Sequence, residues 1–151
     1  MPGSPIPASP APIVVAETAP ATLQLRRMLD GTWPLSTAQT LSHARQAVNG
    51  DTPLILCGCH FDEGRMYDLL RWVRGQQPLR HIPFLTIRVL EGELDDAMYE
   101  SVKIATGALG GNGFVDLLRW ERRYGPQAAG QRFAEHVKAM ALGAPGHLDS
   151  L

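Results

Sequence analysis

The chain has 151 residues, of which 44% are hydrophobic and 19% charged, which suits one domain with a sizeable core. Its formal net charge of −1 gives no overall field that favours nucleic acid or an acidic membrane. The sequence has no apolar stretch long enough to span a bilayer and no signal-peptide pattern at its start. Only Gly58 separates Cys57 from Cys59, so a disulfide between them would be strained. This favours reduced thiols and a cytoplasmic protein.

The two ends differ in composition from the rest of the chain. Residues 1–12 contain five prolines, which favour neither a regular helix nor a core, so we expect a disordered lead-in there. Residues 143–151 are expected to form a flexible tail. The folded domain is therefore predicted to span residues 13–142.

Buried strands alternate with amphipathic helices between these ends. Short apolar runs suit strands that are buried on both faces, and these lie at 13–16, 33–38, 53–57, 81–89 and 113–115. Apolar residues at helical spacing predict helices over 25–29, 41–48, 66–73, 94–105 and 126–142. Because each strand is followed by a helix, we predict an α/β fold: a doubly wound, five-stranded parallel sheet with helices on both faces.

The glycine-rich segment 107–113 is a weak candidate for a phosphate-binding loop. Such loops follow a strand and open a helix, so that the helix N-terminus faces the anion. This segment instead follows a predicted helix and enters a predicted strand. We interpret it as a helix stop and a turn.

Ligands and chemistry in doubly wound folds gather at the carboxyl ends of the strands. The polar or reactive residues expected at those ends are Glu17, Thr18, Cys57, Gly58, Cys59, His60, Thr86, Arg88 and Asp116. This arrangement resembles the receiver domain of response regulators, the CheY-like family with a flavodoxin-like fold. The resemblance covers residues 13–142 as a pattern of elements.

The resemblance implies a phosphorylation site. A receiver has paired acids after its first strand, a phospho-accepting Asp after the third, a Ser or Thr after the fourth, and a Lys followed by Pro after the fifth. The acids hold Mg²⁺, which prefers oxygen ligands, and the acceptor is a carboxylate nucleophile. The Lys and the hydroxyl contact the phosphoryl group.

This chain keeps the frame of that site and lacks most of its chemistry. Glu17 matches one of the paired acids, whereas Thr18 replaces the other. The third strand ends in Cys57 and Gly58, without a carboxylate. Thr86 matches the hydroxyl position.

The fifth strand shows a further loss. Asp116 stands where the resemblance implies the lysine, and no proline follows it. The resemblance thus implies a pseudo-receiver: a cytoplasmic, bacterial, non-enzymatic signalling module of two-component or phosphorelay type. It would act through protein–protein contacts without Asp phosphorylation and without a cofactor.

Asp62 is an alternative acceptor, displaced by several residues from the end of the third strand. Without paired acids and a lysine, a phosphoryl group would be poorly held there. A carboxylate just before a helix commonly caps it and favours its dipole. We therefore interpret Asp62 as the cap of the helix that follows.

A second function class comes from Cys57, Cys59 and His60, which could serve a metal- or redox-sensing domain. On an extended segment residues 57 and 59 point to the same side. Structural zinc sites, however, use longer spacers between cysteines and four ligands. Packing of Cys57 and partial exposure of Cys59 is the preferred interpretation.

The segment 119–124 combines three arginines with two aromatic residues, the types that dominate binding hot spots. Its candidate interaction residues are Arg119, Trp120, Arg122, Arg123 and Tyr124. The resemblance places them near a surface that carries dimer or partner contacts in receivers. The expected partner is a histidine kinase, a phosphotransfer or output protein, or a second copy of the chain. Binding to nucleic acid or to a membrane is not expected. The alternative is an Arg-rich turn whose Trp120 packs inward.

Overall fold

The structure, a computed structural model, describes residues 10–90 and 96–143. The first nine residues of the predicted lead-in, and the predicted tail from residue 144, lie outside the described residues. Ala11, near the end of that predicted lead-in, accepts a hydrogen bond from Nε1 of Trp33 at 2.9 Å. The part of the lead-in next to the first strand therefore contacts the domain.

The strands form one parallel sheet, and the predicted fold class is confirmed. Its members are β1 (Ile13–Ala16), β2 (Leu35–Ala38), β3 (Ile55–Gly58), β4 (Phe84–Arg88) and β5 (Gly113–Asp116). The order across the sheet is β2-β1-β3-β4-β5, and every neighbouring pair is parallel. Since β1, β3 and β4 are buried on both faces, their sequences do not alternate between apolar and polar residues, and Thr86 and Arg88 of β4 are buried as well.

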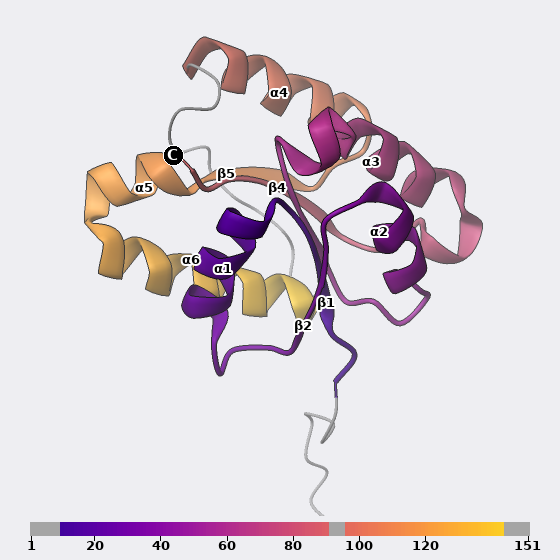
Figure 1. Ribbon diagram of the computed structural model, residues 1–151, viewed down its shortest axis with the longest axis horizontal. Coiled ribbons are helices and arrows are strands. Elements are labelled where there is room, and N and C mark those ends of the chain that lie inside the picture. The colour runs from indigo at the N-terminus through magenta and orange to yellow at the C-terminus, as the bar shows by residue number, and fades with distance from the viewer. Residues whose placement is uncertain (1–9, 91–95, 144–151) are drawn as a thin grey trace, which may run out of the picture.

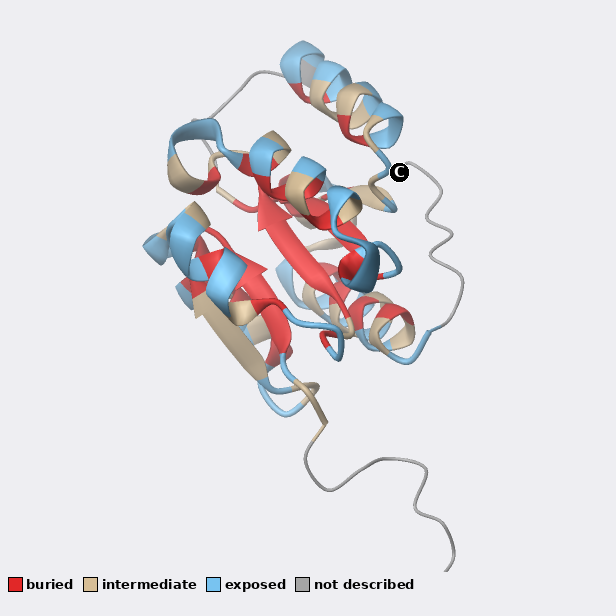
Figure 2. Ribbon diagram, turned by 90° about the vertical axis from the view of Figure 1, so that its right-hand side faces the viewer, coloured by how far each residue is buried: buried red, intermediate tan, exposed pale blue. Residues whose placement is uncertain are grey.

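Helices cover both faces of the sheet (Figure 1). They are α1 (Ala19–Leu29), α2 (Leu41–Ala47), α3 (Met66–Gly75), α4 (Asp96–Ala108), α5 (Leu117–Tyr124) and α6 (Pro126–Ala141), with short 3-10 turns η1 (Phe61–Gly64) and η2 (Gln77–Leu79). One core lies between the sheet and α1, α5 and α6, and the other between the sheet and α2 and α3. Figure 2 shows the buried strands in the centre and the exposed outer faces of the helices.

Two helices differ from the prediction. The segment 119–124, for which the sequence leaves an interaction surface or an Arg-rich turn as alternatives, belongs to the helix α5. The apolar spacing that predicts the helix over 94–105 includes Ala97 and Met98 on its inward side. On α4 these two residues are exposed, and Tyr99 is buried instead. The ring of Tyr99 lies over the guanidinium of Arg88 and beside Phe114, so these contacts set which face of α4 turns to the sheet.

Arg74, near the end of α3, joins three segments at the amino edge of the sheet. Its guanidinium donates to the backbone carbonyls of Gly110, Arg80 and Ile82, and to Oδ1 of Asn112. The same Oδ1 accepts from the amide of Phe84, so the contact reaches the start of β4. Burial lowers the pKa of Arg74, yet its charge is matched by four acceptors.

We predict that Arg74→Ala lowers the free energy of unfolding by about 2 kcal/mol, because it removes four charge-assisted hydrogen bonds, of which the one to the carbonyl of Ile82 is partly buried. The matched control is Arg71→Ala, which removes an exposed arginine whose ion pair with Asp68 is 3.7 Å long and solvent-exposed. That change should cost less than about 0.5 kcal/mol. Urea denaturation compares them, and equal losses would contradict the structural role of Arg74.

Candidate functional site at the carboxyl ends of the strands

The carboxylate of Glu17 is buried at the end of β1. The residue is only 3% exposed, and its backbone amide donates to the carbonyl of Ala38 on β2. Its side chain folds back, so that Oε1 accepts from the amide of Thr18 at 2.8 Å. The prediction that Glu17 and Thr18 directly follow the first strand is confirmed.

Gly58 leaves the space that Glu17 fills. Ala16 pairs with Cys57 across the β1–β3 ladder, which puts Glu17 level with Gly58. A Cβ atom built on Gly58 would overlap the carboxyl carbon and both carboxylate oxygens of Glu17. The end of β3 therefore has no carboxylate of its own, and the carboxylate of β1 occupies the volume of the missing side chain.

Cys57, the residue before Gly58, is fully buried in the core on the α2 and α3 side. Burial raises its pKa well above the ordinary value for cysteine, and the negative charges of Glu17 and Cys59 raise it further. The thiol is therefore protonated at neutral pH. A protonated, enclosed thiol is neither a nucleophile nor a metal ligand.

Thr86 and Arg88 are both expected around the end of the fourth strand, but Thr86 lies inside it. It is the third of the five residues of β4 and pairs with Cys57 and Phe114. Its side chain is fully buried, and its hydroxyl has no hydrogen-bond partner among the described residues. The strand ends at Arg88, as expected for that residue.

Arg88 and Asp116 form an ion pair across the ends of β4 and β5. Nη1 of Arg88 lies 3.0 Å from Oδ2 of Asp116, and their side chains are 5% and 13% exposed. The guanidinium also lies over the ring of Tyr99, 3.9 Å from the ring centre. Asp116 has a second role, since its Oδ1 caps α5 by accepting from the amide of Arg119 at 3.0 Å.

Cys59 and His60 leave the strand and lie in the turn that follows β3. The extended geometry that would have aligned the two thiols therefore does not hold. The thiol of Cys59 approaches the carbonyl of Ile87 at 3.4 Å. Within the described residues, no group of three or more His, Cys, Asp or Glu side chains could hold a metal ion, and this includes Cys57, Cys59 and His60.

Asp62 caps a different helix from the one predicted. Its Oδ2 accepts from the amide of Leu41, the first residue of α2, at 2.8 Å. The other carboxylate oxygen of Asp62, Oδ1, lies 3.4 Å from Nη1 of Arg65. The backbone at Asp62 and Glu63 is left-handed, which turns the chain so that the side chain of Asp62 reaches α2 and not α3.

The candidate interaction segment is divided between core and surface. Trp120 is only 2% exposed and packs in the core with Leu117, so it is not a surface contact, and the alternative in which it packs inward is correct for this residue. The helical period explains this, since residues 117 and 120 share the buried face of α5. Arg119, Arg122 and Arg123 lie on the exposed side, and Tyr124 is half-buried.

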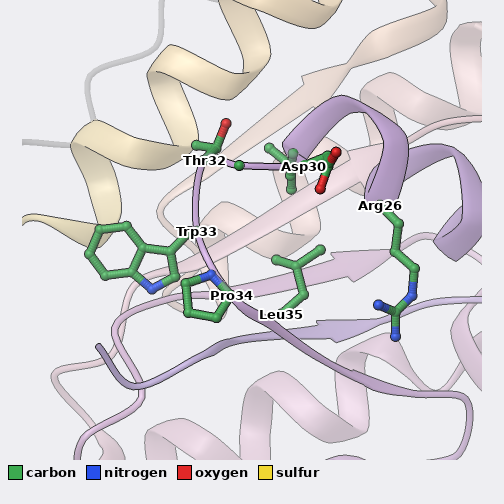
Figure 3. A pocket seen from close by; sticks show the side chains of 8 residues that line it. Arg26, Asp30, Thr32, Trp33, Pro34 and Leu35 are labelled. Atoms are coloured by element: carbon green, nitrogen blue, oxygen red, sulfur yellow. The ribbon is translucent and has the colours of Figure 1, made fainter. Parts of the chain in front are cut away.

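Other features lie away from the strand ends. A hollow of about 410 Å³ lies between α1 and β2, at the amino edge of the sheet, and includes Arg26, Asp30 and Trp33 in its lining (Figure 3). The glycine-rich segment ends α4, where the amide of Gly111 donates to the carbonyl of Thr106. No helix in the described part of the chain has both the length and the apolar character needed to cross a membrane.

Comparisons with known proteins give similarity in structure alone. No family model matches the sequence, and no curated protein matches it. A response regulator from Chloroflexus aurantiacus J-10-fl is 19% identical and has a TM-score of 0.63, with 88% of this chain and 98% of that chain covered. The receiver domain of a signal transduction histidine kinase from Syntrophus aciditrophicus is 21% identical, with a TM-score of 0.61 and coverage of 93% and 96%.

A third similar structure is the receiver domain of a sensor histidine kinase from Pseudomonas aeruginosa PAO1, which has a magnesium ion in its active-site cleft. It is 13% identical, with a TM-score of 0.62 and coverage of 90% of this chain and all of that chain. Together with the strand order, these similarities define a doubly wound, flavodoxin-like α/β domain. Within that class, the chain has the CheY-like fold of response-regulator receiver domains.

We predict that Gly58→Ala lowers the free energy of unfolding by about 1–3 kcal/mol, because the added methyl group competes with the Glu17 carboxylate for one volume. In a Glu17→Ala background the same change should cost much less, so a double-mutant cycle should give a coupling energy of at least about 1 kcal/mol. Urea denaturation of the four proteins measures it. Additive losses would show that the two residues do not share this space.

We predict that Cys59 reacts with iodoacetamide at pH 8 at least about ten times faster than Cys57, because a raised pKa lowers the thiolate fraction tenfold per unit and burial blocks access. The single variants Cys57→Ser and Cys59→Ser each leave one thiol, whose labelling is followed by intact mass. In guanidinium chloride the two rates should converge. Equal rates in the folded proteins would contradict the enclosed position of Cys57.

Proposed function

We propose that this chain is a signalling module of two-component type that acts through protein–protein contacts and is not phosphorylated at its strand ends. The observation that carries the proposal is the Glu17 carboxylate in the volume beside Gly58. The receivers that this chain resembles place a phospho-accepting Asp at the end of the third strand. Here that position has no nucleophile, and its space is already filled.

The charges around the site also favour a module without phosphotransfer. A receiver uses a lysine after the fifth strand to contact the phosphoryl group, whereas this chain has Asp116 there. The nearest cation on the neighbouring strand, Arg88, is held by that same aspartate. Because a carboxylate at this position repels a phosphoryl group, phosphate binding would be weak.

The contacts of Arg88 suggest how the module keeps one conformation. The guanidinium links β5, through Asp116, to α4, through the ring of Tyr99. Removing one partner of such a buried pair leaves a charge without compensation, which makes rearrangement costly. The α4–β5 face would then be set by the fold itself and not by phosphorylation.

The module would be non-enzymatic, bacterial and cytoplasmic, and would need no cofactor. Its partner would be a histidine kinase, a phosphotransfer or output protein, or a second copy of the chain. The contact surface would include Arg119, Arg122, Arg123 and Tyr124, which α5 presents beside β5. A metal-sensing role is not favoured, because Cys57, Cys59 and His60 do not form a group that could hold a metal ion. A redox role for Cys57 is not favoured either, because burial encloses its thiol and raises its pKa.

We predict that the protein gains no phosphoryl group when it is incubated with Mg²⁺ and acetyl phosphate, because no carboxylate nucleophile stands at position 58. Intact mass spectrometry detects any added phosphoryl group. Amide NMR spectra recorded with beryllofluoride detect binding of this phosphoryl analogue at the strand ends. A receiver domain with its acceptor Asp serves as the positive control. Stoichiometric acyl phosphate, or beryllofluoride-induced shifts around Glu17 and Gly58, would defeat the proposal.

A further inference from the structure

The corner between α5 and α6 carries a local positive charge on an otherwise acidic chain. From Arg119 to Arg132 the sequence has four arginines and one glutamate, a formal charge of +3. The whole chain carries −1, so the remaining residues carry −4. This difference in sign confines the attraction for an anionic partner to one part of the molecule.

The fold gathers these charges on one side. Arg119, Arg122 and Arg123 recur at helical spacing on the face of α5 opposite its buried residues, and all three are exposed. The next helix, α6, starts two residues after α5 ends and runs back alongside it in Figure 1. This return brings Arg132 of α6 to the same corner.

Tyr124 stands between two of the guanidinium groups. That of Arg132 lies 4.4 Å from the centre of the Tyr124 ring, and that of Arg123 lies 5.7 Å from it. The ring orients both side chains through cation–π contacts and leaves their N–H groups available to further acceptors. Arg119, Arg123 and Arg132 form no ion pair with any described residue.

A hollow adjoins this group of side chains. It has a volume of about 340 Å³ and is lined by Tyr124, Gly125, Pro126, Gln127, Ala128 and Gln131. The arginines supply donors for carboxylates, and the hollow offers aromatic and polar contacts to a neighbouring side chain. Arginine with tyrosine is the combination found at the centres of protein interfaces.

We propose that the α5–α6 corner, formed by Arg119, Arg122, Arg123, Tyr124 and Arg132, binds an acidic segment of a partner protein. This inference rests on the proposed function, since it names the chemistry of the partner that the signalling module contacts. Bidentate pairs between guanidinium and carboxylate groups supply the attraction. A nucleic acid is disfavoured because the −4 charge of the remaining chain repels a long polyanion.

The test uses the full chain and a fluorescein-labelled peptide of alternating glutamate and tyrosine, with binding followed by fluorescence anisotropy. Arg123→Glu/Arg132→Glu should weaken binding at least about tenfold at low salt. Arg27→Glu/Arg80→Glu makes the same charge change at exposed positions elsewhere and should alter affinity less than about twofold. Arg123→Gln/Arg132→Gln, which only removes charge, should weaken binding to an intermediate degree.

Two results would overturn the acidic-partner inference. One is equal weakening by the corner and control variants, which would show general electrostatic attraction. The other is tighter binding of a single-stranded oligonucleotide of the same length and charge, which would indicate a nucleic-acid surface. Neither result affects the conclusion of the phosphorylation experiment. If instead the chain is phosphorylated and the corner still binds the peptide, only the proposed function is contradicted.

Discussion

The arrangement at the carboxyl ends of the strands depends on the buried carboxylate of Glu17, at the end of β1. A buried charge is costly unless polar groups compensate it, and the amide of Thr18 supplies one such contact to Glu17. The side chain reaches this position only because Gly58, level with it on the next strand, has no Cβ atom. The acidic group beside β3 is thus supplied by β1. Burial raises the pKa of the Cys57 thiol, and the charge of this carboxylate raises it further.

A second buried charge organises the other half of the site. Arg88 is compensated by the carboxylate of Asp116 and by the ring of Tyr99, so one guanidinium holds together β4, β5 and α4. Asp116 also caps α5, which connects the ion pair to the helix that carries Arg119. The loss of the lysine expected after the fifth strand is therefore more than an absence. Each carboxylate oxygen of Asp116 has a structural contact: Oδ2 pairs with Arg88, and Oδ1 caps α5.

Tertiary contacts explain where Asp62 and Met98 differ from the positions expected from the sequence. Asp62 precedes α3 but caps α2, because a left-handed turn redirects its side chain to a helix more than twenty residues earlier. The outward position of Met98 follows from Tyr99, whose ring is drawn to Arg88. The helix α5 had a signal in the sequence, since Asp116 precedes it as a capping residue and residues 117 and 120 share one face. The short length of the segment hid that periodicity.

The sequence by itself determined the order of strands and helices, because continuous apolar runs and helical stripes follow directly from burial on two faces or on one. It also determined that neither position 57 nor position 58 carries a carboxylate, since that depends only on which residue is present. Only the tertiary structure decided that Glu17 fills the space beside Gly58, that Thr86 is enclosed in the strand, and that Arg88 pairs with Asp116. Those outcomes depend on the register between strands far apart in the chain, which no local pattern encodes.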